Sequence, residues 1–117
     1  MTYRATARLV IKSSDEELPG VFGHGCVLLL EGVEREHSLN RAAKSMGMAY
    51  SKAWRIVKEA EAQLGCALLD RDGARGSSVT PAGKRAIAAY EELQADIDRI
   101  LADRAPALIA NISGPAN

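Results

Sequence analysis

Residues 38–65 read SLNRAAKSMGMAYSKAWRIVKEAEAQLG, and this stretch decides the fold. In its first half the apolar side chains fall at positions i, i+3, i+4 and i+7, which are Leu39, Ala42, Ala43 and Met46. This spacing predicts a short helix with one buried face. Ser38 is suited to cap its start, and Gly47 can take the left-handed conformation that ends a helix.

A second helix is predicted from about residue 49 to residue 64, ended by Gly65. Its apolar positions repeat at steps of four, three and four residues, at Ala53, Val57, Ala60 and Leu64. Polar and basic side chains occupy the other side, at Ser51, Lys52, Arg55 and Lys58. Two helices joined by a tight glycine-containing turn, the second with a basic face, are typical of a helix-turn-helix that presents a helix to the DNA major groove.

The charges of the chain are unevenly distributed although they cancel. Fifteen Lys and Arg residues balance fifteen Asp and Glu residues. Between His37 and Arg85 there are nine basic and four acidic residues, a local surplus of five positive charges. The rest of the chain is therefore acidic, and such polarity is what phosphate binding requires. A solvated surface can show the same split by chance, so the charge pattern alone does not decide the function.

Length and composition indicate one domain with a mainly helical, aliphatic core. The chain has 117 residues, of which 47% are hydrophobic, 26% charged and only 4% aromatic. No apolar run reaches the length of a membrane span or signal sequence, so we expect a cytoplasmic protein without a membrane partner. Cys26 and Cys66 lie far apart without metal-ligand spacing, which predicts free thiols and neither a metal nor a cofactor.

The segments before residue 38 predict a strand, a loop and a helix. Residues 5–12 read ATARLVIK and favour a short strand, which the turn-rich SSDEELPG follows. A first helix is expected from about residue 24 to Glu36, with a wide apolar stripe. Gly32 in its middle indicates either a close helix contact or a tolerated imperfection.

The segments after Gly65 predict a hairpin and a long helix. CALLDRDGARGSSVTP reads as strand 66–70, a glycine-rich tip and a return strand 78–79. Thr80 and Pro81 favour a helix start, and the apolar pattern continues to about Asp103, a length of about 33 Å. Such a helix overshoots a three-helix core, so its second half should pack against another copy of the chain.

Two motifs within this order of elements resemble a known family. SLNRAAKSMGMAYSKAW matches the pattern S-x-x-x-A-A-K-x-x-G-(M/I)-S-Y-x-x-A-W, and LLDRDGARGSSVTPAG matches a strand, a glycine-rich wing and an L-T-P-x-G helix start. Residues 38–85 thus resemble the amino-terminal winged-helix domain of the ModE molybdate-responsive regulators and, more distantly, the DNA-binding domain of LysR-type regulators. RLVIKSSDEELPGVFGHG is similar to the strand and loop that precede it, so the likeness covers about residues 8–104.

The resemblance implies a mainly α fold with a small β-wing. We expect a winged helix-turn-helix in residues 1–104, with a three-helix core, a hairpin wing, an N-terminal strand and a long C-terminal dimerisation helix, followed by a loosely ordered tail at 105–117. Ala49 replaces the family's serine at the start of the recognition helix, and the wing tip is shorter than usual. Nothing after Arg104 could form the molybdate-binding β-domains, so a molybdate-sensing role is not expected.

By this resemblance the chain is a homodimeric, sequence-specific transcriptional regulator. Helix 49–64 should enter the major groove of double-stranded DNA while wing 71–79 reaches flanking DNA. The expected DNA contacts are Ser38, Lys44, Tyr50, Ser51, Lys52, Arg55, Lys58 and Arg75, with Lys52 and Arg55 foremost. The expected dimer contacts are Val27, Leu30, Leu93, Ile97, Ile100 and Leu101. Trp54 is interpreted as a packing residue rather than a base-stacking platform, and Arg71 as either a wing contact or a partner of Asp70 and Asp72.

Two other function classes compete with DNA binding. An enzyme is disfavoured because His24 and His37 have no Cys, Ser or carboxylate at catalytic spacing and no phosphate-binding loop is present. A winged-helix module that binds another protein fits the core and the long helix equally well. Such a module would not need Lys52, Arg55 and Arg75 together. The sequence does not show which operator is bound or whether a small-molecule effector is sensed.

Overall fold

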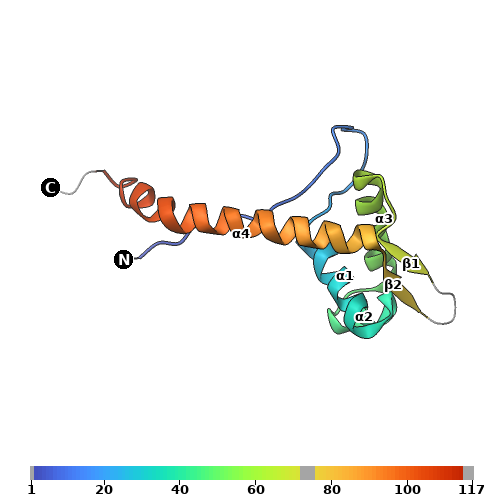
Figure 1. Cartoon of the computed structure of the whole chain (residues 1–117). Helices are drawn as coiled ribbons and strands as arrows, with labels where there is room; N and C mark the ends of the chain where they lie inside the picture. The colour runs from blue at the N-terminus through green and yellow to red at the C-terminus, as the bar shows by residue number, and fades with distance from the viewer. Residues whose placement is uncertain (1, 72–75, 115–117) are drawn as a thin grey trace.

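Four helices and one β-hairpin make up the computed structural model, which describes residues 2–71 and 76–114 (Figure 1). The elements are α1 (His24–Glu36), α2 (Leu39–Ser45), α3 (Tyr50–Leu64), β1 (Leu69–Arg71), β2 (Ser77–Val79) and α4 (Pro81–Ala110). Helices α1 to α3 and the hairpin gather at one end, and α4 projects far beyond them. The molecule is accordingly elongated, with extents of 68 × 32 × 23 Å. This is the predicted winged helix-turn-helix arrangement.

The core lies where α1, α2 and α3 meet the first turns of α4. Its largest fully buried side chains include Phe22 from the loop before α1, Leu29 and Leu30 from α1, Leu68 from the residue before β1, and Tyr90 from α4. The rings of Phe22 and Tyr90 pack edge to face, with centroids 5.8 Å apart. Of the predicted inward positions of α3, Ala53, Val57 and Ala60 are buried, and Leu64 is partly buried against the core. The helical periodicity thus placed the core correctly.

Capping residues end the helices where the sequence predicts. The Ser38 hydroxyl accepts a hydrogen bond from Arg41 N at 3.2 Å, and Thr80 Oγ1 accepts one from Gly83 N at 2.9 Å. Gly47 and Gly65 take positive φ angles of 66° and 71° after α2 and α3. Ala49, at the start of α3, makes no side-chain cap. Helix α3 therefore begins without the hydroxyl that caps α2 and α4.

Gly32 marks a close approach of α1 to α2. A Cβ atom at this position would lie 2.8 Å from the Cβ of Ala42. Both residues are buried. Of the two readings that the sequence allows for this glycine, the close helix contact is therefore correct.

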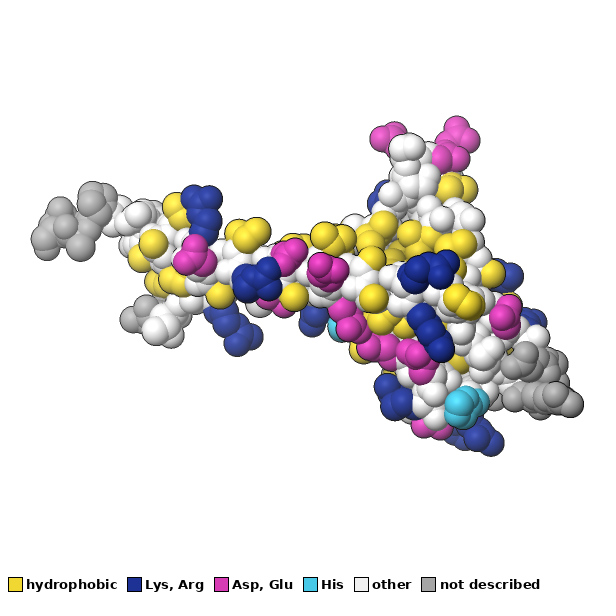
Figure 2. Space-filling model, viewed as in Figure 1, with side chains coloured by type: hydrophobic (Ala, Val, Ile, Leu, Met, Phe, Trp, Pro, Cys, Tyr) yellow, Lys and Arg dark blue, Asp and Glu magenta, His cyan; other side chains and the backbone are white. Residues whose placement is uncertain are grey.

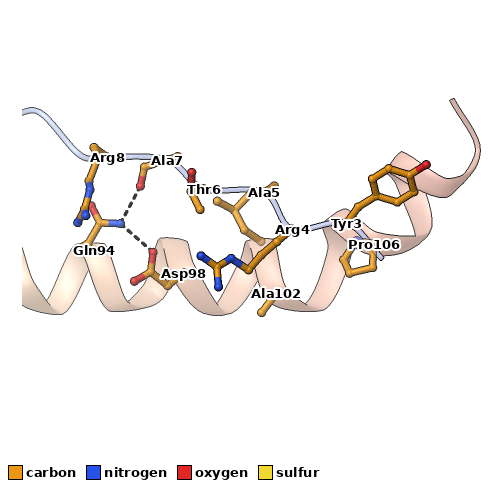
Figure 3. A pocket seen from close by; sticks show the side chains of 11 residues that line it. Tyr3, Arg4, Ala5, Thr6, Ala7, Arg8, Gln94, Asp98, Ala102 and Pro106 are labelled. Carbon is orange, nitrogen blue, oxygen red and sulfur yellow. Dashed lines mark hydrogen bonds between the residues drawn. The ribbon is translucent and has the colours of Figure 1, made fainter. Parts of the chain in front are cut away.

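The predicted N-terminal strand is not formed. Within residues 2–22, strand pairing is limited to one antiparallel bridge, in which Ile11 and Phe22 exchange N–H···O bonds of 2.8 and 2.9 Å. The segment 2–9, which we call the arm, instead runs extended beside α4 (Figures 1 and 3). Its backbone is held by side chains rather than by a second strand, because Gln94 accepts from Leu9 N and donates to Ala7 O, each at 2.8 Å.

The two strands of the hairpin pair antiparallel, but the first starts three residues later than predicted and the return strand starts one residue earlier. Leu69 pairs with Val79 and Arg71 with Ser77. The predicted start at Cys66 is wrong because Glu61 Oε2 accepts from Leu68 N at 2.8 Å, which commits this donor to α3. The tip at residues 72–75 lies outside the described residues.

Helix α4 continues past its predicted end near Asp103. It runs through Pro106 to Ala110, and Ala105 is buried. A proline inside a helix costs about 3 kcal/mol because it removes an N–H donor. The arm passes beside this position, where Tyr3 and Pro106 line the same cavity of about 540 Å³ between the arm and α4 (Figure 3).

Two of the predicted dimer contacts belong to the core. Val27 and Leu30 are 3% and 0% exposed within the single chain. The apolar stripe of α1 is wide because it packs on several elements at once, and these two residues therefore offer no surface to a second copy. Among the described residues, no helix is long and apolar enough to cross a membrane.

Replacing Gly32 with Ala should test the α1–α2 contact. The added methyl group would meet Ala42, and we expect the free energy of unfolding to fall by about 1–3 kcal/mol despite the better helix propensity of Ala. The double variant Gly32→Ala, Ala42→Gly should be more stable than the two single changes predict together, because it removes the opposing methyl group. Urea unfolding measures all four proteins, and a Gly32→Ala variant as stable as the parent would show that the contact is not tight.

Candidate nucleic-acid interface

The outward face of α3 is polar and basic, as predicted. Ser51, Lys52, Arg55 and Lys58 are exposed, whereas Ala53 and Val57 between them are buried. No acidic residue occurs in α3 before Glu59. The amino-terminal half of the helix therefore combines cationic side chains with the positive end of the helix dipole.

Two of the three cations on this face already have acidic neighbours. Arg55 Nη1 lies 2.9 Å from Glu59 Oε1, and Lys58 Nζ lies 3.7 Å from Glu61 Oε1. Lys52 forms no ion pair with any residue that the structure describes. Pairs with such exposed cations contribute little to stability, so Arg55 and Lys58 can exchange a carboxylate for another anion at small cost.

The charge of the molecule is polarised along α3. The N-terminal loop at residues 13–20 is fixed near the far end of this helix, because Gln63 Nε2 donates to the carbonyl oxygens of Leu18, Pro19 and Gly20 at 3.0–3.1 Å. The same loop carries exposed acidic side chains. It projects at the top of the view in Figure 1, and Figure 2 shows acidic groups at its tip. The basic half of α3 and the acidic loop thus occupy opposite ends of one helix.

Trp54 packs against the core, as interpreted from the sequence, but it also supports two cations. Lys58 Nζ lies 4.8 Å from the centre of its ring, and the Arg71 guanidinium carbon lies 3.7 Å from it. Both distances are within the range of attractive cation–π contacts. Arg71 makes no ion pair with Asp70 or any other described carboxylate, so the interpretation of Arg71 as a partner of Asp70 is wrong. Asp72, the other partner considered, lies outside the described residues.

The sequence does not predict the contact of Arg71 with Trp54, because the two residues are far apart along the chain. Seventeen positions separate it from Trp54, and only the fold of the hairpin against α3 brings the two together. The sequence offers one signal, a lone tryptophan on a helix whose exposed face is otherwise basic. That signal does not identify which arginine stacks on the ring.

The remaining predicted contacts divide into three groups. Ser38 and Tyr50 lie near each other beside the hairpin, where both line the same surface hollow. Lys44 is exposed in the last turn of α2 but does not line that hollow. Arg75 lies outside the described residues, so its predicted role stays a prediction.

The base of the wing is joined to the corner between α1 and α2. Ser77 N donates to His37 O at 3.0 Å. Gly76 has a φ of +103°, and a Cβ atom there would stand 2.2 Å from the same carbonyl oxygen. Only glycine allows this approach without distortion, because its missing Cβ avoids both the clash and the unfavourable φ. The hairpin is thereby fixed beside the start of α2.

Burial shifts the pKa of two groups in α1. Burial raises the pKa of the Cys26 thiol to about 12, which makes it an unreactive core residue. Burial and the neighbouring Glu91 raise the pKa of Glu31, which joins α1 to α4. Within residues 2–71 and 76–114, no three His, Cys, Asp or Glu side chains form a group that could hold a metal ion.

Comparison with known proteins places this geometry in a family. The family model described as "Bacterial regulatory helix-turn-helix protein, lysR family" matches residues 27–84. The chain is 31% identical over 114 residues to the molybdenum transport protein ModE of Azotobacter vinelandii and 33% identical over 70 residues to ModE of Herbaspirillum seropedicae. The first match covers 94% of this chain but 42% of that protein, and the second covers 56% and 26%. The chain thus spans less than half the length of these relatives.

Two solved structures share the fold. The BenM DNA-binding domain in complex with benA site 1 DNA has a TM-score of 0.52 and 26% identity, and the match covers 66% of this chain and 88% of that one. The same domain with catB site 1 DNA also has a TM-score of 0.52, at 22% identity, covering 78% and 94%. The second likeness shows the fold alone.

Replacing Gly76 with Ala should detach the wing base from His37. Gly47 offers a matched control, because it also has a positive φ but a Cβ atom added there would have nothing within 4 Å. Gly47→Ala should cost only the backbone penalty of about 1–2 kcal/mol. Gly76→Ala should cost about 1 kcal/mol more because of the clash. Urea unfolding compares the two, and equal losses would contradict the anchoring contact.

Proposed function

Residues 27–84 belong to the lysR family of bacterial regulatory helix-turn-helix proteins, and on that premise we propose that this protein is a transcriptional regulator that binds duplex DNA as a homodimer. The observation that carries the proposal is the exposed cationic half of α3, which follows a close-packed α2 and lies beside an anchored hairpin. The likeness to a domain solved in complex with DNA supports the same reading. The proposed function involves no catalytic activity.

Helix α3 is the recognition helix of this proposal. Its amino-terminal half would enter the major groove, where an arginine can donate two hydrogen bonds to one guanine and a lysine can neutralise a phosphate. Arg55 is the candidate for base reading, since its guanidinium is exposed and its carboxylate neighbour Glu59 is on its own helix. Lys52 is the candidate for phosphate contact, with Ser51 and Tyr50 beside it at the helix start.

The projecting half of α4 supports the homodimer. Leu93, Ile100 and Leu108 are 47%, 58% and 58% exposed, and Ile97 is half-buried. These four residues recur at steps of four, three and eight, so they share one side of the helix. The arm covers the neighbouring side, where Gln94, Asp98 and the predicted dimer contact Leu101 line its cavity. An apolar stripe along an isolated helix is best buried against an identical stripe, which a twofold axis provides.

A protein-binding winged helix is the alternative function. It would use the same core and the same α4 stripe, and it would leave Lys52 and Arg55 without a role. The two proposals differ in salt dependence, because DNA binding releases counterions from the phosphate backbone and weakens steeply as salt rises.

The double variant Lys52→Ala, Arg55→Ala should lose most of the DNA affinity. We expect a loss of roughly tenfold to several-hundredfold, because one base contact is worth about 1–3 kcal/mol and the phosphate contact adds to it. Fluorescence anisotropy with labelled fragments from the source genome, titrated at several salt concentrations, measures it. Arg104→Ala is the control, since it removes an exposed arginine from the distal half of α4.

Unchanged affinity in the double variant would contradict the role of α3. If the unaltered protein binds no genomic fragment even at low salt, the protein-interaction alternative replaces the proposed function.

Replacing Ile100 with Lys should convert the proposed dimer to a monomer. The side chain is more than half exposed in the single chain, so the change should leave the fold intact while it places a charge in the interface. Asp103→Lys on the next turn is the control, because it introduces the same side chain on the charged side of α4. Sedimentation equilibrium at micromolar concentration measures the mass. A parent protein that is monomeric there would overturn the dimer.

A further inference from the structure

A surface hollow of about 270 Å³ lies between the start of α2, the start of α3 and the wing. We call it the notch. It is lined by Ser38, Leu39, Asn40, Tyr50, Arg71, Gly76 and Ser77. Three segments that are far apart in the sequence therefore meet around one opening, next to the basic half of α3.

The side chains around the notch are suited to an anion. Five of its lining residues carry polar side chains that can donate hydrogen bonds, one of them the guanidinium of Arg71. None of the described residues that line it is acidic. The Ser38 hydroxyl accepts a bond from Arg41 N, and among the described residues it has no acceptor for its own proton. This proton can thus be donated to a ligand.

Arg71 is held in place by the ring beneath it. Its guanidinium carbon lies 3.7 Å from the centre of the Trp54 ring. A stacked guanidinium keeps its N–H donors in its own plane, directed past the ring edge, and stacking leaves them free for a ligand. A fixed arginine also loses less side-chain entropy on binding than a free one.

The position of the notch is fixed by the wing base. Gly76 and Ser77 contact the His37 carbonyl, one residue before Ser38, so the wing side and the α2 side of the notch are bonded to each other. The opening is therefore preorganised rather than formed when a ligand arrives.

We propose that the notch binds one phosphodiester group of the DNA backbone, with Arg71 as its charged contact and Trp54 as the residue that positions Arg71. This rests on the proposed function and adds to it a backbone contact between the recognition helix and the wing. Such a contact sets the register of α3 on the duplex and carries no sequence information itself.

The salt dependence of DNA binding tests the charged contact. Arg71→Ala should lower the slope of log affinity against log salt by about one and weaken operator and unrelated DNA by the same factor of roughly ten. Arg71→Lys should keep the slope and lose part of the affinity, because lysine retains the charge but not the stacked, forked geometry. Arg4→Ala, which removes an arginine of the arm, should change neither value.

The positioning role of Trp54 has its own readout. It is the only tryptophan of the chain, so its fluorescence reports on the stacked guanidinium. Addition of unlabelled duplex should change the emission of the parent protein and change that of Arg71→Ala much less. Trp54→Phe, which keeps an aromatic ring, should bind DNA better than Trp54→Leu, while urea unfolding of both variants separates this effect from loss of packing.

The outcomes distinguish failure of the notch as a phosphodiester site from failure of the proposed DNA-binding function. If DNA binds but Arg71→Ala leaves the salt slope and the emission change intact, the notch is not a phosphodiester site and the proposed function stands. If the parent binds no DNA, the proposed function fails first. Inorganic phosphate at constant ionic strength should not saturate the emission change at millimolar concentration, and saturation that requires Arg71 would identify a free-anion site instead.

Discussion

The close packing of α1 on α2 at Gly32 and Ala42 is the constraint on which the rest of the structure depends. A residue larger than glycine would push the two helices apart, because its Cβ would stand 2.8 Å from that of Ala42. The corner between these helices carries both Ser38, which caps α2, and the His37 carbonyl, which holds the wing. One contact in the core therefore positions α2, the turn into α3 and the base of the hairpin together.

Two buried glutamines extend this arrangement beyond the three helices. Gln63 at the end of α3 accepts from Ser13 N and donates to three carbonyls of the N-terminal loop, and Gln94 on α4 binds the arm. A carboxamide suits this position because it both donates and accepts, so it can satisfy a backbone that has no partner strand. The acidic loop is consequently held away from the basic start of α3, which preserves the polarity of the surface without any net charge.

Local features of the sequence predicted most of the fold, because they depend on neighbours within a few residues. The period of apolar side chains located α1, α2 and α3, Ser38, Gly47 and Gly65 marked the ends of α2 and α3, and Thr80 marked the start of α4. The errors share one cause, which is competition from distant parts of the chain. The arm forms no strand because Gln94 takes its hydrogen bonds, α4 passes Pro106 beside the arm, and Val27 and Leu30 face a core rather than a second copy.

The candidate site shows the same difference between features set by neighbouring residues and features set by distant ones. The exposure of Lys52, Arg55 and Lys58 followed from the helical period, whereas the stacking of Arg71 on Trp54 required the hairpin to fold back onto α3.

The continuity of α4 connects the proposed DNA contacts with the proposed dimer. Its Thr80 cap accepts from Gly83 N and donates to Ala67 O, so the helix begins as part of the wing base. It then runs without interruption for 30 residues, about 45 Å, to the end of the exposed apolar stripe. A continuous helix of this length is rigid enough to fix the orientation of one copy relative to the other. The pairing of two α4 helices would therefore set the distance between two recognition helices, and hence the spacing of the half-sites, while residues of α3 would set only their sequence.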